Sequence, residues 1–191
     1  MAEQKKVTFP YESEKERLAG YDYYQKLFMG DHFTAFNMKV ESQDFNKEYS
    51  KIRYVKANFA GLLSKIIADM LFGEPIKIKL QDGDQEWMDN FLQENNFLTV
   101  LYENALTNSF MGDQLFKLRI DKRFVSDTEP SIILDNVPAS IYFPEINPGN
   151  INQVPSVQEL AWTFKVMQAD GKEKKYLRKE IHKSGTIENK V

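Results

Sequence analysis

The sequence predicts an α+β fold, with helices first, including one long amphipathic helix, and a mostly antiparallel β meander after them. Two observations lead to this prediction. Between Glu12 and Met111, apolar side chains recur mainly at the three- and four-residue spacing of helix faces. From Gly112 onward, short strand-like runs are separated by Gly, Pro, Asn and Asp. Because the two patterns are segregated rather than alternating, they favour an α+β fold over a parallel α/β fold.

The first region, residues 1–111, is predicted to be mainly helical, with one strand near residues 76–80. A first helix covers Glu12–Phe28 and ends near Gly30, which suits a helix stop. Asp31–Asn46 has a mixed pattern and is predicted to form a turn and an extended piece. A long helix then covers Lys47–Phe72.

The long helix has the clearest pattern in the chain. One face is formed by Ile52, Val55, Phe59, Leu62, Ile66 and Met70, and it is widened by Leu63, Ile67 and Leu71. So wide an apolar stripe predicts a helix that is buried over more than a narrow seam. Gly73 suits the left-handed position after a helix end, and Pro75 prevents the helix from continuing.

The rest of the first region predicts a strand and two shorter helices. Ile76–Leu80 alternates apolar and lysine residues, as a half-buried strand does. Asp82-Gly83 marks a turn, and Asp84 can cap a short helix that contains Trp87 and Leu92. Asn95-Asn96 breaks this helix before a second one over Phe97–Met111.

The second region, residues 112–191, is predicted to be β-rich. The predicted strands are Gln114–Ile120, Ser131–Leu134, Ala139–Phe143, Val157–Met167 and Lys175–Lys183. Asp170-Gly171 is a hairpin signal between the last two. The sequence after Glu180 reads as a strand, a turn and the opening of another strand. We therefore expect an unpaired sheet edge, and a polypeptide that is truncated at the C-terminus.

Composition excludes several classes of protein. The 191 residues are 42% hydrophobic and 28% charged, a globular balance, and contain no cysteine. Disulfide scaffolds, thiolate metal sites and cysteine nucleophiles are thereby excluded. No signal peptide is recognisable, and the most apolar stretch, residues 57–72, is too short to cross a bilayer. We expect a soluble protein that does not associate with a membrane.

The charge is uneven along the chain. The formal net charge is −3, although the residues from Lys165 onward carry eight Lys and Arg against four Asp and Glu. A chain of this mild acidity is a poor candidate for tight, non-specific binding of duplex DNA. Lysines on an exposed strand edge are the simpler explanation for the basic end.

Residues able to support catalysis are few. Asp82, Asp84 and Glu86, with Asp89 nearby, suggest a magnesium site of a metal-dependent nuclease or hydrolase, to which His32 beside Asp31 could contribute a base. The same carboxylates are also favoured at the first turn of a helix, where N–H groups are unpaired. No glycine-rich phosphate loop is present. We therefore predict no enzyme, no cofactor and no metal, and keep the hydrolase as an alternative.

A second alternative is a bacterial adaptor with an α+β interaction domain. Its contact surface would be the tyrosine-rich first helix, on which Tyr23 lies away from the side of Tyr24 and Phe28. Tyrosine is enriched at protein interfaces, so this helix is a candidate contact.

Several short motifs carry a resemblance to a known family. They are Tyr23-Tyr24, Phe28, Gly30-Asp31-His32, Asn58, Ile66-Ile67-Ala68-Asp69, Phe72-Gly73-Glu74-Pro75-Ile76, Tyr176-Leu177-Arg178, Glu180-Ile181-His182, Gly185 and Ile187. In these motifs the chain resembles the N-terminal part, the wing region, of portal proteins of tailed bacteriophages, the siphophages of Gram-positive bacteria in particular. The resemblance implies structural roles for Tyr24, Gly30, Asp31, His32, Asn58, Asp69, Phe72, Gly73, Glu74 and Pro75.

The resemblance also implies a function and partners. Portal proteins form a ring, most often a dodecamer, at one vertex of the capsid in the virion, and they assemble in the cytoplasm of the bacterial host. Double-stranded DNA passes through the ring, the large subunit of the packaging terminase docks on one side, and head-completion or adaptor proteins join head to tail on the other. Scaffolding and capsid proteins are further partners. A gene carried on a prophage would fit the same family.

Overall fold

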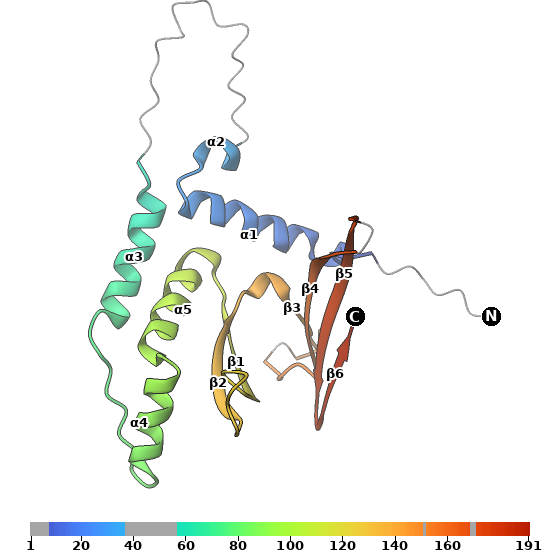
Figure 1. Ribbon diagram of the computed structural model, residues 1–191. Coiled ribbons are helices and arrows are strands. Elements are labelled where there is room, and N and C mark those ends of the chain that lie inside the picture. Colours follow the sequence, from blue (N-terminus) through green and yellow to red (C-terminus); the bar gives the residue numbers. More distant parts are fainter. Residues whose placement is uncertain (1–7, 37–56, 151, 169–170) are drawn as a thin grey trace, which may run out of the picture. The chain divides into compact units, whose positions relative to one another are not determined.

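The computed structural model describes residues 8–36, 57–150, 152–168 and 171–191 (Figure 1). The predicted residues 47–56 of the long helix, and Asp170 of the predicted hairpin, lie outside this part of the chain. The described chain is α+β, and all its α-helices precede its strands. Two compact units divide it: Glu16–Val137, and the described part of Met1–Lys15 together with Pro138–Val191. The change from helix to strand therefore falls inside the first unit.

The first unit contains helices α1 to α5. Their bounds are Lys15–Phe28 (α1), His32–Ala35 (α2), Phe59–Phe72 (α3), Gln85–Glu94 (α4) and Phe97–Met111 (α5). Helix α3 lies along α5 (Figure 1). Phe28 at the end of α1 stacks on Phe110 near the end of α5, with 4.2 Å between the ring centroids. Asn96, between α4 and α5, is left-handed with φ 46°, a conformation that asparagine tolerates better than most residues.

The first unit also has a two-stranded antiparallel sheet. Strands β1 (Leu115–Asp121) and β2 (Ser131–Val137) pair along their whole length, and Arg119 Nε donates to Asp135 Oδ2 at 2.6 Å across them. Strand β2 is attached to α5 by Asn136, whose Nδ2 donates to the carbonyl of Val100 at 2.9 Å.

Asn95 joins α4 to the edge of β2. Its side-chain Nδ2 donates to the carbonyl of Ile132 at 3.2 Å, and its Oδ1 accepts from the N–H of Leu134 at 2.8 Å. Nδ2 also donates to the carbonyl of Phe91 at 2.8 Å. One buried amide thus satisfies two backbone groups of β2 in the way that a neighbouring strand would.

The second unit is a four-stranded antiparallel meander. Its strands β3 (Tyr142–Glu145), β4 (Val157–Met167), β5 (Glu173–Lys183) and β6 (Thr186–Lys190) pair in chain order. Two short 3₁₀ turns, η1 (Glu12–Glu14) and η3 (Ala139–Ile141), belong to the same unit. Just before η1, Tyr11 packs edge-on against Phe143, donates to Glu159 and accepts from Lys179. The chain around Tyr11 is therefore held on this sheet.

Two predicted elements are wrong. Ile76–Leu80 forms no strand. Its backbone hydrogen-bonds to the side chain of Gln85 instead of to another strand: Leu80 N–H donates to Gln85 Oε1 at 2.9 Å, and Gln85 Nε2 donates to the Ile78 carbonyl at 3.0 Å. The predicted turn and extended piece over Asp31–Asn46 is wrong at its start, where His32–Ala35 form α2, and residues 37–46 of this prediction lie outside the described part of the chain. The Asp31 carboxylate instead caps α2 by accepting from Thr34 N–H at 3.4 Å.

Three further details differ from the predictions. Gly73 ends α3 in the right-handed region, at φ −69° and ψ −21°, rather than in the left-handed one. The predicted strand over Ala139–Phe143 begins as the 3₁₀ turn η3 and becomes β3 only at Tyr142. The described part of the long helix is not buried over a broad face: it buries Gly61, Ser64 and Ala68 and exposes its large side chains.

The role of Asn95 in the fold can be tested by replacing it with alanine. Asn95→Ala should lower the free energy of unfolding by about 2–4 kcal/mol, because it leaves polar backbone groups of β2 without partners in a buried place. Urea denaturation followed by circular dichroism measures the loss. Asn90→Ala, at an exposed position of α4, is the matched control and should leave stability nearly unchanged.

Candidate functional site

The acidic turn proposed for a hydrolase is a helix cap. Asp84 Oδ1 accepts from the N–H of Trp87 at 3.0 Å, and Asp89 Oδ1 accepts from Gln85 Nε2 at 2.8 Å. Asp82 and Glu86 are exposed. Among the described residues, no group of three or more His, Cys, Asp or Glu is placed to hold a metal ion. The carboxylates of this turn are explained by the N-terminus of α4.

The two histidines lie in different units. His32 opens α2, with its ring 6.2 Å from the ring of Phe36, while the neighbouring Asp31 caps the same helix. His182 Nε2 lies 2.6 Å from Glu180 Oε1 on β5. The contact of His182 is thus a carboxylate on its own strand, and that of His32 is an aromatic ring on its own helix turn.

The tyrosine-rich helix is partly internal. Tyr21 is buried, donates to Asp113 Oδ2 at 2.6 Å and accepts from Arg17 Nη1 at 3.1 Å. Burial first, and the Asp113 carboxylate second, raise the pKa of Tyr21 above its ordinary value. Tyr23 instead contacts Tyr24 and Phe36 edge-on, and the Tyr24 side chain remains 44% exposed. Only part of this helix is thus free to form a contact surface.

Several motif residues meet where α1 ends and α3 begins. Asn58 caps α3 by accepting from Gly61 N–H at 3.0 Å, and its Nδ2 donates to the carbonyl of Phe28 at 2.8 Å. Gly30 has φ +73°, and a Cβ placed on it would lie 3.2 Å from the Asn58 side chain. One asparagine therefore joins two helices that are distant in sequence, and a glycine makes room for it.

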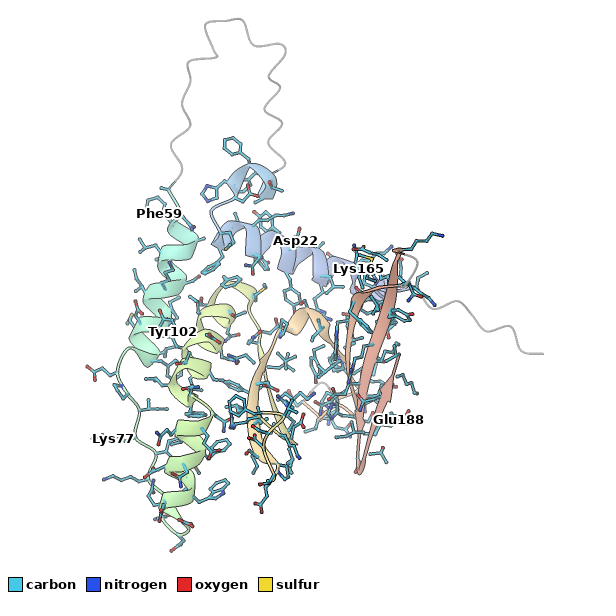
Figure 2. The ribbon with its side chains drawn as sticks, in the orientation of Figure 1. Asp22, Phe59, Lys77, Tyr102, Lys165 and Glu188 are labelled. Atoms are coloured by element: carbon cyan, nitrogen blue, oxygen red, sulfur yellow. The ribbon has the colours of Figure 1, made fainter. Side chains whose placement is uncertain are left out.

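Asp69 makes a second link, this time between α3 and α5. Tyr102 on α5 donates to Asp69 Oδ1 at 2.8 Å, and Figure 2 labels Tyr102 beside α3. The bond raises the pKa of Tyr102, because ionisation would place a phenolate against the carboxylate.

The Phe72-Gly73-Glu74-Pro75 motif ends α3. The N–H of Gly73 donates to the carbonyl of Asp69 at 2.8 Å, and a Cβ on Gly73 would lie 2.4 Å from that oxygen. Glycine is required here by the close approach of the backbone, whereas the predicted reason was a positive φ. Glu74 and Pro75 are exposed.

Helix α3 exposes a row of large apolar side chains. We name as the ridge Phe59, Leu62, Ile66 and Met70, which are 66%, 53%, 43% and 81% exposed. Phe59, labelled in Figure 2, begins the row at the start of α3. Isolated exposed leucines are ordinary, but a continuous row on one helix face indicates a surface for association.

Two adjoining hollows form a groove beside the ridge. One of about 320 Å³ lies between α1, α3 and α5, lined among others by Tyr24, Leu63 and Phe110. The other, of about 220 Å³, lies between α3, α5 and β1, lined among others by Leu71, Leu101 and Phe116. Ile67 and Ser109 line both, so we treat them as one α3–α5 groove. Sequence reasoning did not find the groove, because its walls come from four separate elements.

Comparison with protein families decides the identity. The family model described as phage portal protein, SPP1 Gp6-like, matches residues 11–182. The chain belongs to this family of phage portal proteins. The match runs through both units and includes the motif residues from Tyr23 to His182, while Gly185 and Ile187 lie just beyond it. Comparison with curated proteins finds no significant match. The portal-family chain has, among its described residues, no helix that is both long and apolar enough to cross a membrane.

Gly30 offers a test of the junction between α1 and α3. Gly30→Ala should lower stability by about 1–2 kcal/mol, because it places a Cβ at positive φ and against Asn58. Part of that cost should disappear in the Asn58→Ala background, where the crowded side chain is removed. Thermal denaturation of the four proteins of this cycle measures the coupling.

Gly20→Ala is the control for that cycle. Gly20 lies inside α1, and its added Cβ would come no closer than 3.8 Å to Tyr24. This substitution should stabilise the chain by about 0.5–1 kcal/mol. Equal effects at Gly20 and Gly30 would contradict a special role for the junction.

The link between Tyr102 and Asp69 predicts a pH dependence. The pKa of Tyr102 is raised above 10.0 in the folded chain, so the stability it contributes is present below that pH and is lost as pH rises through the folded pKa. The stability difference between the parent and Tyr102→Phe should therefore shrink above pH 10. Urea midpoints across this range measure it, and Asp69→Asn should move the step toward the ordinary value. A difference that is constant with pH would contradict the link.

Proposed function

We propose that this chain is a structural subunit of a phage portal ring, which serves as the conduit for DNA at a capsid vertex. The family match over residues 11–182 is the observation that carries the proposal. In this role the ring docks the packaging terminase and connects head to tail. The energy for packaging comes from ATP hydrolysis in the terminase, so the portal subunit contributes shape and contacts rather than catalysis.

The exposed ridge of α3 supports an assembling role. Large apolar side chains that stay in water cost free energy, and burying them against another surface recovers about 25 cal/mol per Å². A closed symmetric ring offers each subunit such a surface. We propose structural roles for the motif residues Tyr24, Gly30, Asp31, His32, Asn58, Asp69, Phe72, Gly73, Glu74 and Pro75.

The proposed partners follow the family. They are other copies of the chain in a dodecameric ring, the terminase large subunit, head-completion or adaptor proteins, scaffolding and capsid proteins, and the duplex DNA that passes through. The proposed location is the capsid vertex of the virion, after assembly in the host cytoplasm. A formal net charge of −3 suits a conduit along which duplex DNA slides without being gripped.

The proposal predicts large homomeric rings. The protein produced from its complete gene should give class averages of rings with a central hole in negative stain, and a native mass of many subunits. Co-expression with its scaffolding protein is the appropriate control, since it supplies an assembly partner. Discrete heteromeric complexes without self-assembly, under both conditions, would favour the adaptor instead.

A further inference from the structure

Helix α3 is apolar on nearly every side. Its small residues Gly61, Ser64 and Ala68 are buried in the first unit, where α3 packs on α5. The ridge points away from them at helical spacing, and the groove lies at the side, with Ile67 and Leu71 in its wall. A helix that is apolar all round is normally buried all round. The ridge and the groove are therefore two apolar surfaces of α3 that another surface can bury.

The exposed area is large enough for a specific contact. From the exposed fractions of their side chains, the ridge and the groove of one copy present on the order of 1,000 Å² of apolar surface, about the minimum that a specific protein–protein interface buries. The charged residues of the helix, Lys65 and Asp69, fall on the side opposite the groove. No Lys, Arg, Asp or Glu is among the residues that line the groove.

The two surfaces have complementary forms. Ridge residues follow one another at spacings of three and four, the pattern by which a helix seats in an apolar groove. An unrelated helix that filled the groove would leave the ridge exposed. A second copy of this chain covers both, since each copy supplies one ridge and one groove.

We propose that the α3 ridge of one copy seats in the α3–α5 groove of a second copy. The inference rests on the proposed portal function and identifies one of the contacts between neighbouring subunits. Because the ridge and the groove are different surfaces, the contact is head-to-tail, and its repetition generates a ring when the rotation between copies closes, as the proposed portal ring requires.

Two charge substitutions test the contact by self-association. Sedimentation velocity of the 191-residue chain should show association that Met70→Glu on the ridge weakens at least about tenfold, as should Phe116→Glu in the groove. Both side chains are exposed, so both variants should keep the circular dichroism and melting behaviour of the parent. Val125→Glu, at a fully exposed position outside both surfaces, is the matched control and should associate as the parent does.

Mixing the two variants tests the head-to-tail geometry. The Met70→Glu copy retains its groove and the Phe116→Glu copy retains its ridge, so an equimolar mixture should form heterodimers that grow no further. A mixture that remains monomeric would overturn the proposal. A parent chain that stays monomeric up to about 1 mM would overturn it as well.

Cysteine cross-linking distinguishes this contact from a symmetric one. The chain has no cysteine, so single changes can be placed without background. Met70→Cys mixed with Phe116→Cys should give a mixed cross-linked dimer with a short bis-maleimide, in excess over the two homodimers. Homodimers of Met70→Cys alone would instead indicate ridge against ridge and overturn the proposal. If rings of the complete protein persist with Met70→Glu, this contact fails while the portal function stands.

Discussion

The close packing of α3 on α5 determines the organisation of the first unit. Gly61, Ser64 and Ala68 are the residues of α3 that become buried, and Ala105 is the buried residue of α5. Small side chains let two helices approach closely, but they remove little apolar area from water. The large side chains of α3 are consequently left on its outer surfaces. Burial of the small residues of α3 against the rest of the first unit therefore leaves its large residues to form the ridge and one wall of the groove.

Side-chain amides provide the polar counterpart of this packing. Asn58 joins the start of α3 to the end of α1, Gln85 satisfies the backbone of residues 78 and 80, and Asn95 satisfies the edge of β2. Each amide has both a donor and an acceptor, so one side chain can meet two backbone groups at once. Irregular or edge segments are thereby held without forming larger sheets. The prediction of a strand at Ile76–Leu80 was wrong for this reason.

The second unit is organised differently, by long strand pairing. Strands β4 and β5 pair over eleven residues, with Trp162 opposite Arg178 and Phe164 opposite Tyr176. These cross-strand pairs make a cation–π contact and a ring stack, which fix the register between the strands. The ridge and the groove, in contrast, belong to the first unit.

The sequence by itself determined the fold class, the order of helices before strands, and the family. Apolar periodicity, helix caps such as Asp84 and helix breaks such as Asn95-Asn96 depend only on residues that are close in sequence. These features can therefore be recognised in the sequence alone. Apolar periodicity predicted the wrong side of α3, because the face of Phe59, Leu62, Ile66 and Met70 is exposed and the small residues are buried instead. Only the tertiary structure decided that its small residues Gly61, Ser64 and Ala68 are the buried ones, and assembled the groove from α1, α3, α5 and β1. Helix packing depends on how closely two backbones approach, which is a property of both surfaces together and not of either sequence segment alone.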